Sequence, residues 1–102
     1  MHDVIFIGDG LDARAYGDAG IPSFAPPRGL LAERVMAEKR RCRVLAMTEG
    51  TFSALPADLA RELREGCWPQ VTIVPELTGE GSRARAQELI RAGLAKASAR
   101  YA

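Results

Sequence analysis

A glycine-rich turn near the N-terminus is the first feature whose residue types and spacing suggest chemistry. Gly8, Gly10 and Ala13 follow an apolar run in the pattern G-x-G-x-x-A, which in dinucleotide-binding folds lets a pyrophosphate approach a helix N-terminus. The acidic residue that should follow the second strand and hold the ribose is replaced by Pro26-Pro27-Arg28. Because a short glycine motif is weak by itself, we predict a plain strand-to-helix turn and no bound cofactor. A small nucleotide- or ligand-binding regulatory module that uses residues 8–13 is the alternative.

Two aspartates in the same turn suggest a metal pair or a phosphoryl-acceptor pocket. Asp9 and Asp12 lie at the start of the expected first helix, where they would also repel a bound phosphate. A phosphorelay receiver needs an aspartate at the end of its third strand, and this chain has Thr48-Glu49 there. We therefore expect Asp9 to cap the helix and Asp12 to interact with the helix dipole, without a metal ion.

Cysteine and histidine are too few for a zinc site or a nucleophile–base pair. Cys42 and Cys67 lack CxxC spacing, and the single histidine is His2 at the terminus. Neither cysteine nor any serine therefore has an evident base. We expect two reduced, partly buried thiols and no enzymatic activity, while the sequence leaves a bridge between the cysteines open.

Four apolar runs separated by helical segments define the elements that must position these residues. The first and third runs are apolar on both faces, which is typical of strands buried in a parallel sheet, and Pro22 makes the weaker second run an edge strand. We expect strands at residues 4–7, 21–25, 44–48 and 71–75, helices at residues 11–18, 29–41, 56–66 and 82–100, and a helical turn at residues 51–55. This alternation predicts an α/β fold: a small four-stranded parallel sheet, Rossmann-like or flavodoxin-like, with helices on both faces and an added C-terminal helix.

Length and charge indicate one domain with unevenly distributed charge. The 102 residues suit a single α/β core, which we place at residues 1–78. The whole chain has a net charge of +1, but residues 79–102 carry five basic and two acidic side chains, so we predict a hinge and a basic C-terminal helix there. Neither a signal peptide nor a membrane-spanning stretch is evident, and we expect a cytoplasmic protein without a nucleic-acid partner.

Four segments of the chain each end in a short, recognisable motif. The opening strand ends in a Gly-Asp turn at residues 4–9, and residues 15–21 begin near an aromatic and close in Ala-Gly-Ile. Residues 43–49 end in Thr-Glu, and residues 70–75 close in Val-Pro. In the order of these four motifs, the sequence resembles the F subunit of the V-type and A-type rotary ATPases. The resemblance covers nearly the whole chain.

The resemblance implies a non-catalytic central-stalk subunit of a rotary ATPase or ATP synthase. Such a subunit binds the coiled-coil rotor-stalk subunit and turns with it between the catalytic head and the membrane ring, so it is peripheral to the membrane through the complex. The family's C-terminal helix is associated with regulation of ATP hydrolysis, and its basic residues here are Arg83, Arg85, Arg91, Lys96 and Arg100. Because the ends of parallel strands meet at one edge, the expected partner contacts are Asp9, Asp12, Thr48, Glu49 and Glu76.

Overall fold

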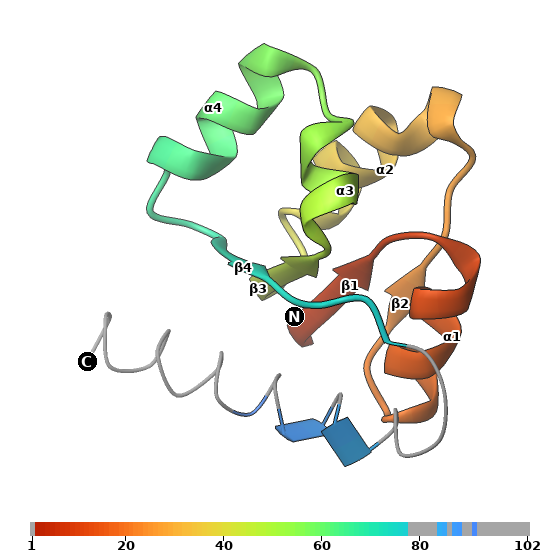
Figure 1. Ribbon diagram of the computed structural model, residues 1–102. Coiled ribbons are helices and arrows are strands. Elements are labelled where there is room, and N and C mark those ends of the chain that lie inside the picture. Colours follow the sequence, from red (N-terminus) through yellow and green to blue (C-terminus); the bar gives the residue numbers. More distant parts are fainter. Residues whose placement is uncertain (1, 78–83, 86, 89–90, 92–102) are drawn as a thin grey trace.

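Four parallel strands form one sheet in the order β2-β1-β3-β4 (Figure 1). The strands are β1 (His2–Ile7), β2 (Ser23–Phe24), β3 (Cys42–Met47) and β4 (Gln70–Ile73). They belong to a computed structural model that describes residues 2–77, 84–85, 87–88 and 91. The order is that of the flavodoxin-like folds, and it confirms the predicted α/β class with a small, all-parallel sheet.

The two central strands are buried on both faces, as their unbroken apolar runs predicted. Val4 lies opposite Val44 and Phe6 opposite Ala46 in the register that β1 and β3 share. The second strand is confirmed at an edge but is shorter than predicted. Pro22 accepts a hydrogen bond from the Phe6 N–H through its carbonyl, 2.9 Å away, yet it has no N–H of its own to donate to a ladder.

Helices cover both faces of this sheet, which confirms the predicted layers. On one face lies α1 (Gly10–Asp18), and on the other lie α2 (Leu31–Glu38), α3 (Glu49–Ser53) and α4 (Ala57–Glu65). A 3-10 turn over Arg28–Leu30 leads into α2. The connections between strands and helices therefore gather at the carboxyl ends of the strands, where the functional residues were expected.

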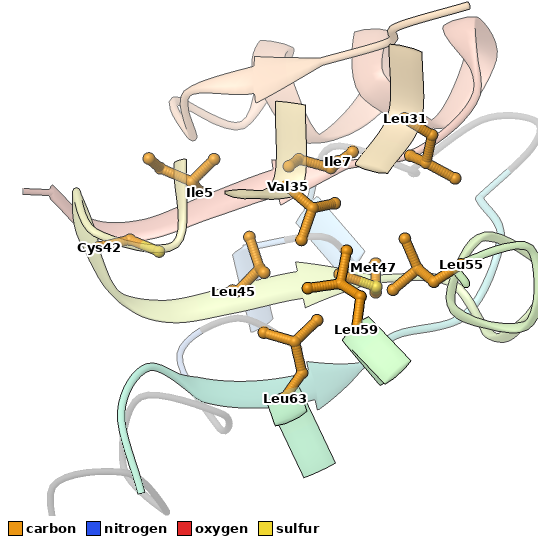
Figure 2. Packing of buried hydrophobic residues seen from close by; sticks show 10 residues of the cluster. All are labelled: Ile5, Ile7, Leu31, Val35, Cys42, Leu45, Met47, Leu55, Leu59 and Leu63. Atoms are coloured by element: carbon orange, nitrogen blue, oxygen red, sulfur yellow. The ribbon is translucent and has the colours of Figure 1, made fainter. Parts of the chain in front are cut away.

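The larger of two cores lies between the sheet and α2, α3 and α4. β1 and β3 direct alternate side chains to this side, and the helices supply leucines and a valine from their inner faces. Figure 2 shows these side chains pointing into one shared layer: Ile5, Ile7, Leu31, Val35, Cys42, Leu45, Met47, Leu55, Leu59 and Leu63. Burial of apolar surface is the main favourable term in folding, so this layer fixes the strand ends.

The core on the α1 face is completed by a segment that follows β4. The rings of Phe6 and Tyr16 stack with their centroids 4.4 Å apart. Val74 and Leu77 are buried in the same cluster, because residues 74–77 run from the β4 edge back across the sheet to α1 (Figure 1). Helix α1 therefore packs against both β1 and this returning segment.

Helix α2 ends at Glu38, three residues earlier than predicted. The predicted helix at residues 29–41 included Lys39, Arg40 and Arg41, but these residues lie beyond α2, where a turn closed by the Arg41 N–H and the Glu38 carbonyl leads into β3. The Glu38 carboxylate is buried and has Arg34 Nη1 at 3.3 Å and Arg41 Nη1 at 3.9 Å. Lys39 extends to Glu62 on α4, 2.9 Å away, so Lys39 and Arg41 form ion pairs within the fold.

Five residues beyond residue 77 are described, and all are helical and exposed: Ala84, Arg85, Gln87, Glu88 and Arg91. The side-chain amide of Gln87 donates a hydrogen bond to the carbonyl of Ala19 over 3.3 Å, which places this stretch beside the end of α1. The limits of the helix predicted at residues 82–100, and the boundary predicted after residue 78, lie outside the described residues.

Candidate functional site

All four strands lead into one hollow at their carboxyl ends, which we call the carboxyl-end cleft. It has a volume of about 260 Å³ and lies where the strand order reverses beside β1, the usual binding position in folds of this class. The connections after β1, β2 and β3 and the segment after β4 all line it: Gly8 and Asp9; Pro26, Arg28 and Leu31; Thr48, Gly50, Thr51 and Ala54; and Glu76. Three of the predicted contacts, Asp9, Thr48 and Glu76, are thus brought together, whereas Glu49 is exposed outside the lining.

Asp9 caps α1, as predicted, and is also part of the cleft wall. Its Oδ1 accepts a hydrogen bond from the Asp12 N–H over 2.9 Å. This bond satisfies one of the free donors at the helix N-terminus. The residue stays exposed, so the carboxylate also contributes negative charge to the cleft.

Thr48 also lines the cleft, is only 4% exposed and caps α3. Its Oγ1 accepts a hydrogen bond from the Thr51 N–H over 3.3 Å, and the two threonine hydroxyls lie 3.0 Å apart. The cap makes the helix begin at Glu49 instead of at the predicted residue 51. A threonine directly after an apolar strand is an N-cap signal that could have predicted this start.

Internal packing explains the first glycine of the G-x-G-x-x-A pattern. A Cβ added at Gly8 would lie 2.6 Å from the Phe6 ring, whereas one at Gly10 would meet nothing within 4 Å. Contact with the protein's own aromatic ring therefore explains Gly8, whereas Gly10, the position at which a pyrophosphate approaches the backbone in dinucleotide-binding folds, is open.

Asp12 is buried, so its prediction as an exposed contact for a partner protein is wrong. The residue is 2% exposed, and its Oδ1 accepts a hydrogen bond from the Leu77 N–H over 2.9 Å. Burial raises the pKa of the Asp12 carboxyl, the hydrogen bond from Leu77 opposes this rise, and the nearby carboxylates of Asp9 and Glu76 add to it. Asp12 therefore holds the returning segment beneath the cleft, a long-range role that local sequence does not reveal.

Tyr16 is a structural residue of the site that the sequence reasoning missed. It lies one helical turn after Asp12, is fully buried, and donates its hydroxyl hydrogen to the Pro75 carbonyl over 2.9 Å. Burial raises the pKa of Tyr16 to about 12, with the Asp12 carboxylate as a further cause. The spacing of Asp12 and Tyr16 on one face of α1 was the available signal.

The charged groups of the carboxyl-end cleft are unequal in number. Asp9 and Glu76 contribute carboxylates, and Arg28 contributes one guanidinium. Within the described part of the chain, none of the three forms an ion pair, and neither does Glu49. The two carboxylates and one guanidinium give the lining a net charge of −1.

The two cysteines lie in different environments and are both free. Cys42 is fully buried, its Sγ lies 3.5 Å from the Glu38 carbonyl, and burial raises its pKa to about 12. Cys67 is exposed, which corrects the prediction that both thiols are partly buried. Nothing in this arrangement makes Cys42 a nucleophile, because a thiol is reactive as its thiolate.

The basic residues predicted on the C-terminal helix are described in part. Arg85 and Arg91 are helical and exposed, and Arg85 lies close enough to Tyr16 to lower the pKa of its phenol slightly against the larger effect of burial. Arg83, Lys96 and Arg100 lie outside the described residues.

No protein-family model, curated protein or solved structure matches this chain. Among residues 2–77 and the five described further on, there is no group of three or more His, Cys, Asp and Glu side chains arranged to hold a metal ion. None of the helices in the same described part is both long and apolar enough to cross a bilayer. The carboxyl-end cleft and its charges are therefore the features from which we infer function.

Proposed function

We propose that the protein is a non-catalytic central-stalk subunit of a V/A-type rotary ATPase or ATP synthase. It binds the coiled-coil rotor-stalk subunit and turns with it beneath the catalytic head. In this proposal the protein is cytoplasmic and associates with the membrane through the complex. The basic C-terminal helix, including Arg85 and Arg91, approaches acidic surfaces of the head by electrostatic attraction and regulates ATP hydrolysis.

The observation that supports this proposal most is that the segments behind the family resemblance meet in space. The Gly8-Asp9 turn and Thr48 line the same cleft. The Val74-Pro75 end is anchored through the Pro75 carbonyl to Tyr16, and Glu76, which follows it, also lines the cleft. A small rigid sheet that presents these turns at one end suits a subunit that grips another protein.

Co-expression with the coiled-coil rotor subunit encoded in the same genome tests the proposal. We expect the two proteins to co-elute in size-exclusion chromatography with light scattering, at a mass equal to their sum. A two-stranded coiled coil of similar net charge and unrelated sequence is the matched control, because it reproduces shape and charge alone. A protein that stays monodisperse beside the rotor subunit, or that binds the control equally well, contradicts the proposal.

A further inference from the structure

Glu76 is held in place by the two residues that flank it. The carbonyl of Pro75 accepts the hydrogen bond from the Tyr16 hydroxyl, and the N–H of Leu77 donates to the Asp12 carboxylate. Both α1 residues are buried, whereas Glu76 between the anchors is exposed and lines the carboxyl-end cleft. The backbone that carries this carboxylate is therefore fixed before any partner arrives, which lowers the entropic cost of binding.

Other lining residues of the cleft are held by hydrogen bonds as well. Asp9 is held as the cap of α1, and Thr48 and Thr51 are joined through their hydroxyls. Glu76 Oε1 lies 4.0 Å from the position that a Cβ would take on Gly50, so a side chain at position 50 would narrow the cleft beside it. The cleft is thus lined by the carboxylates of Asp9 and Glu76, the guanidinium of Arg28 and two threonine side chains, and hydrogen bonds hold Asp9 and both threonines in place before a partner binds.

Exposed apolar side chains follow two of the lining residues closely in the sequence. Leu11, two residues after Asp9, is 74% exposed, and Leu30, two residues after Arg28, is 50% exposed. Pro26 lines both the cleft and an adjoining open hollow that includes Leu30. Exposed apolar groups around a polar cavity are a feature of protein–protein interfaces. They therefore favour a protein as the partner of this cleft over a free ion, which would gain nothing from apolar contacts.

We infer that the carboxyl-end cleft receives one lysine or arginine side chain of the coiled-coil rotor partner, between Asp9 and Glu76, while Leu11 and Leu30 pack against the same helix. The inference rests on the proposed function and adds the chemistry of the contact. Coiled-coil helices carry basic side chains at exposed heptad positions, and a long basic side chain has an apolar stem that can lie against Leu31 and Ala54 in the lining.

Affinity of the purified rotor partner for matched charge variants tests the inference. Glu76→Gln removes the cleft carboxylate, and Glu65→Gln, at the exposed end of α4 outside the cleft, removes the same charge elsewhere. We expect isothermal titration calorimetry to show roughly tenfold weaker binding for Glu76→Gln and little change for Glu65→Gln. Glu76→Arg should weaken binding further, and the salt dependence of Kd should fall for both Glu76 variants and not for the control.

The possible outcomes separate the inference from the proposed function. A complex that forms normally, and whose affinity is the same for Glu76→Arg, Glu76→Gln and Glu65→Gln, overturns the inference and leaves the stalk assignment standing. Failure of the wild-type protein to bind the rotor partner overturns both. Thermal unfolding of each free variant by circular dichroism accompanies the binding data, and Asp9→Asn provides a second cleft variant that retains a good helix cap.

Discussion

The hydroxyl of Tyr16 donates a hydrogen bond to the backbone carbonyl of Pro75, 2.9 Å away and 59 residues later in the chain. Asp12, one turn earlier on α1, accepts a second bond from the Leu77 N–H over 2.9 Å. These two bonds join the first helix to the segment after the last strand. They therefore tie the connection that follows β1 to the one that follows β4, the two segments that supply the carboxylates of the carboxyl-end cleft.

Tyr16→Phe tests the first of these bonds. Phenylalanine keeps the stacking on Phe6 and loses the hydroxyl, leaving the Pro75 carbonyl without that donor. We expect the free energy of unfolding to fall by about 1 kcal/mol, measured by urea denaturation followed by circular dichroism. An unchanged midpoint and slope would mean that the bond contributes no net stability.

Asp12→Ala and Asp12→Asn separate the hydrogen bond from the charge. Alanine removes the acceptor for the Leu77 N–H, and we expect a loss of about 1–3 kcal/mol because a buried donor is left without that partner. Asparagine keeps an acceptor oxygen and removes the buried charge, so its stability near neutral pH should equal or exceed that of the wild type. Equal losses for both variants would show that the negative charge itself is required.

The pH dependence of stability provides a third test at Asp12. Burial raises the pKa of this carboxyl above its ordinary value of 3.8, so the folded state binds the proton more tightly than the unfolded state. Between these two pKa values the free energy of unfolding contributed by Asp12 falls as the pH rises. The stability difference between Asp12→Asn and the wild type should therefore grow from about pH 4 upward and then level off above the raised pKa; a difference that shrinks with pH would contradict this sign.

Gly8→Ala and Gly10→Ala form a matched pair in the glycine-rich turn. A Cβ at residue 8 would lie 2.6 Å from the Phe6 ring, and one at residue 10 would meet no atom within 4 Å. We expect Gly8→Ala to cost about 1–3 kcal/mol through overpacking and Gly10→Ala to change stability by no more than about 0.5 kcal/mol. Thermal denaturation measures both, and similar effects at the two positions would refute the packing explanation.

Thiol labelling distinguishes the two cysteines. Cys67 is exposed, whereas Cys42 is buried with its pKa raised to about 12. In the native protein we expect a maleimide or disulfide reagent to modify one thiol per chain quickly and the second only on unfolding. Cys67→Ser should abolish the fast phase and Cys42→Ser should leave it intact; a fast phase that persists in Cys67→Ser would place Cys42 at the surface.

The sheet could be predicted from the sequence because its signal is local. A short unbroken apolar run, such as the one that ends at Ile7, is typical of a strand buried on both faces. Pro22 correctly placed the second strand at an edge, since proline cannot donate to a ladder. Helix ends were less accurate, because the limits of α2 and α3 depend on the buried carboxylate of Glu38 and on the cap at Thr48.

The candidate site was predicted in part for a related reason. Parallel strands bring their carboxyl ends to one edge, so Asp9, Thr48 and Glu76 could be expected to meet without knowledge of any distance. The hydrogen bond between Asp12 and the Leu77 N–H could not be predicted in this way, because Leu77 is 65 residues away and lies in an irregular segment. A polar residue in the first turn of a helix has the same local pattern whether it faces water or a buried amide.

The late position of Leu77 has a consequence for synthesis of the chain on the ribosome. Within the described residues, Val74 and Leu77 complete the cluster around the aromatic pair on the α1 face, and they are among the last residues of the described core to be translated. A nascent chain that ends before them exposes the Phe6–Tyr16 surface and lacks both hydrogen bonds to α1. Folding of this face is therefore delayed until translation has passed residue 77, and ribosome-bound chains shorter than that should be targets for chaperones that bind exposed aromatic surface.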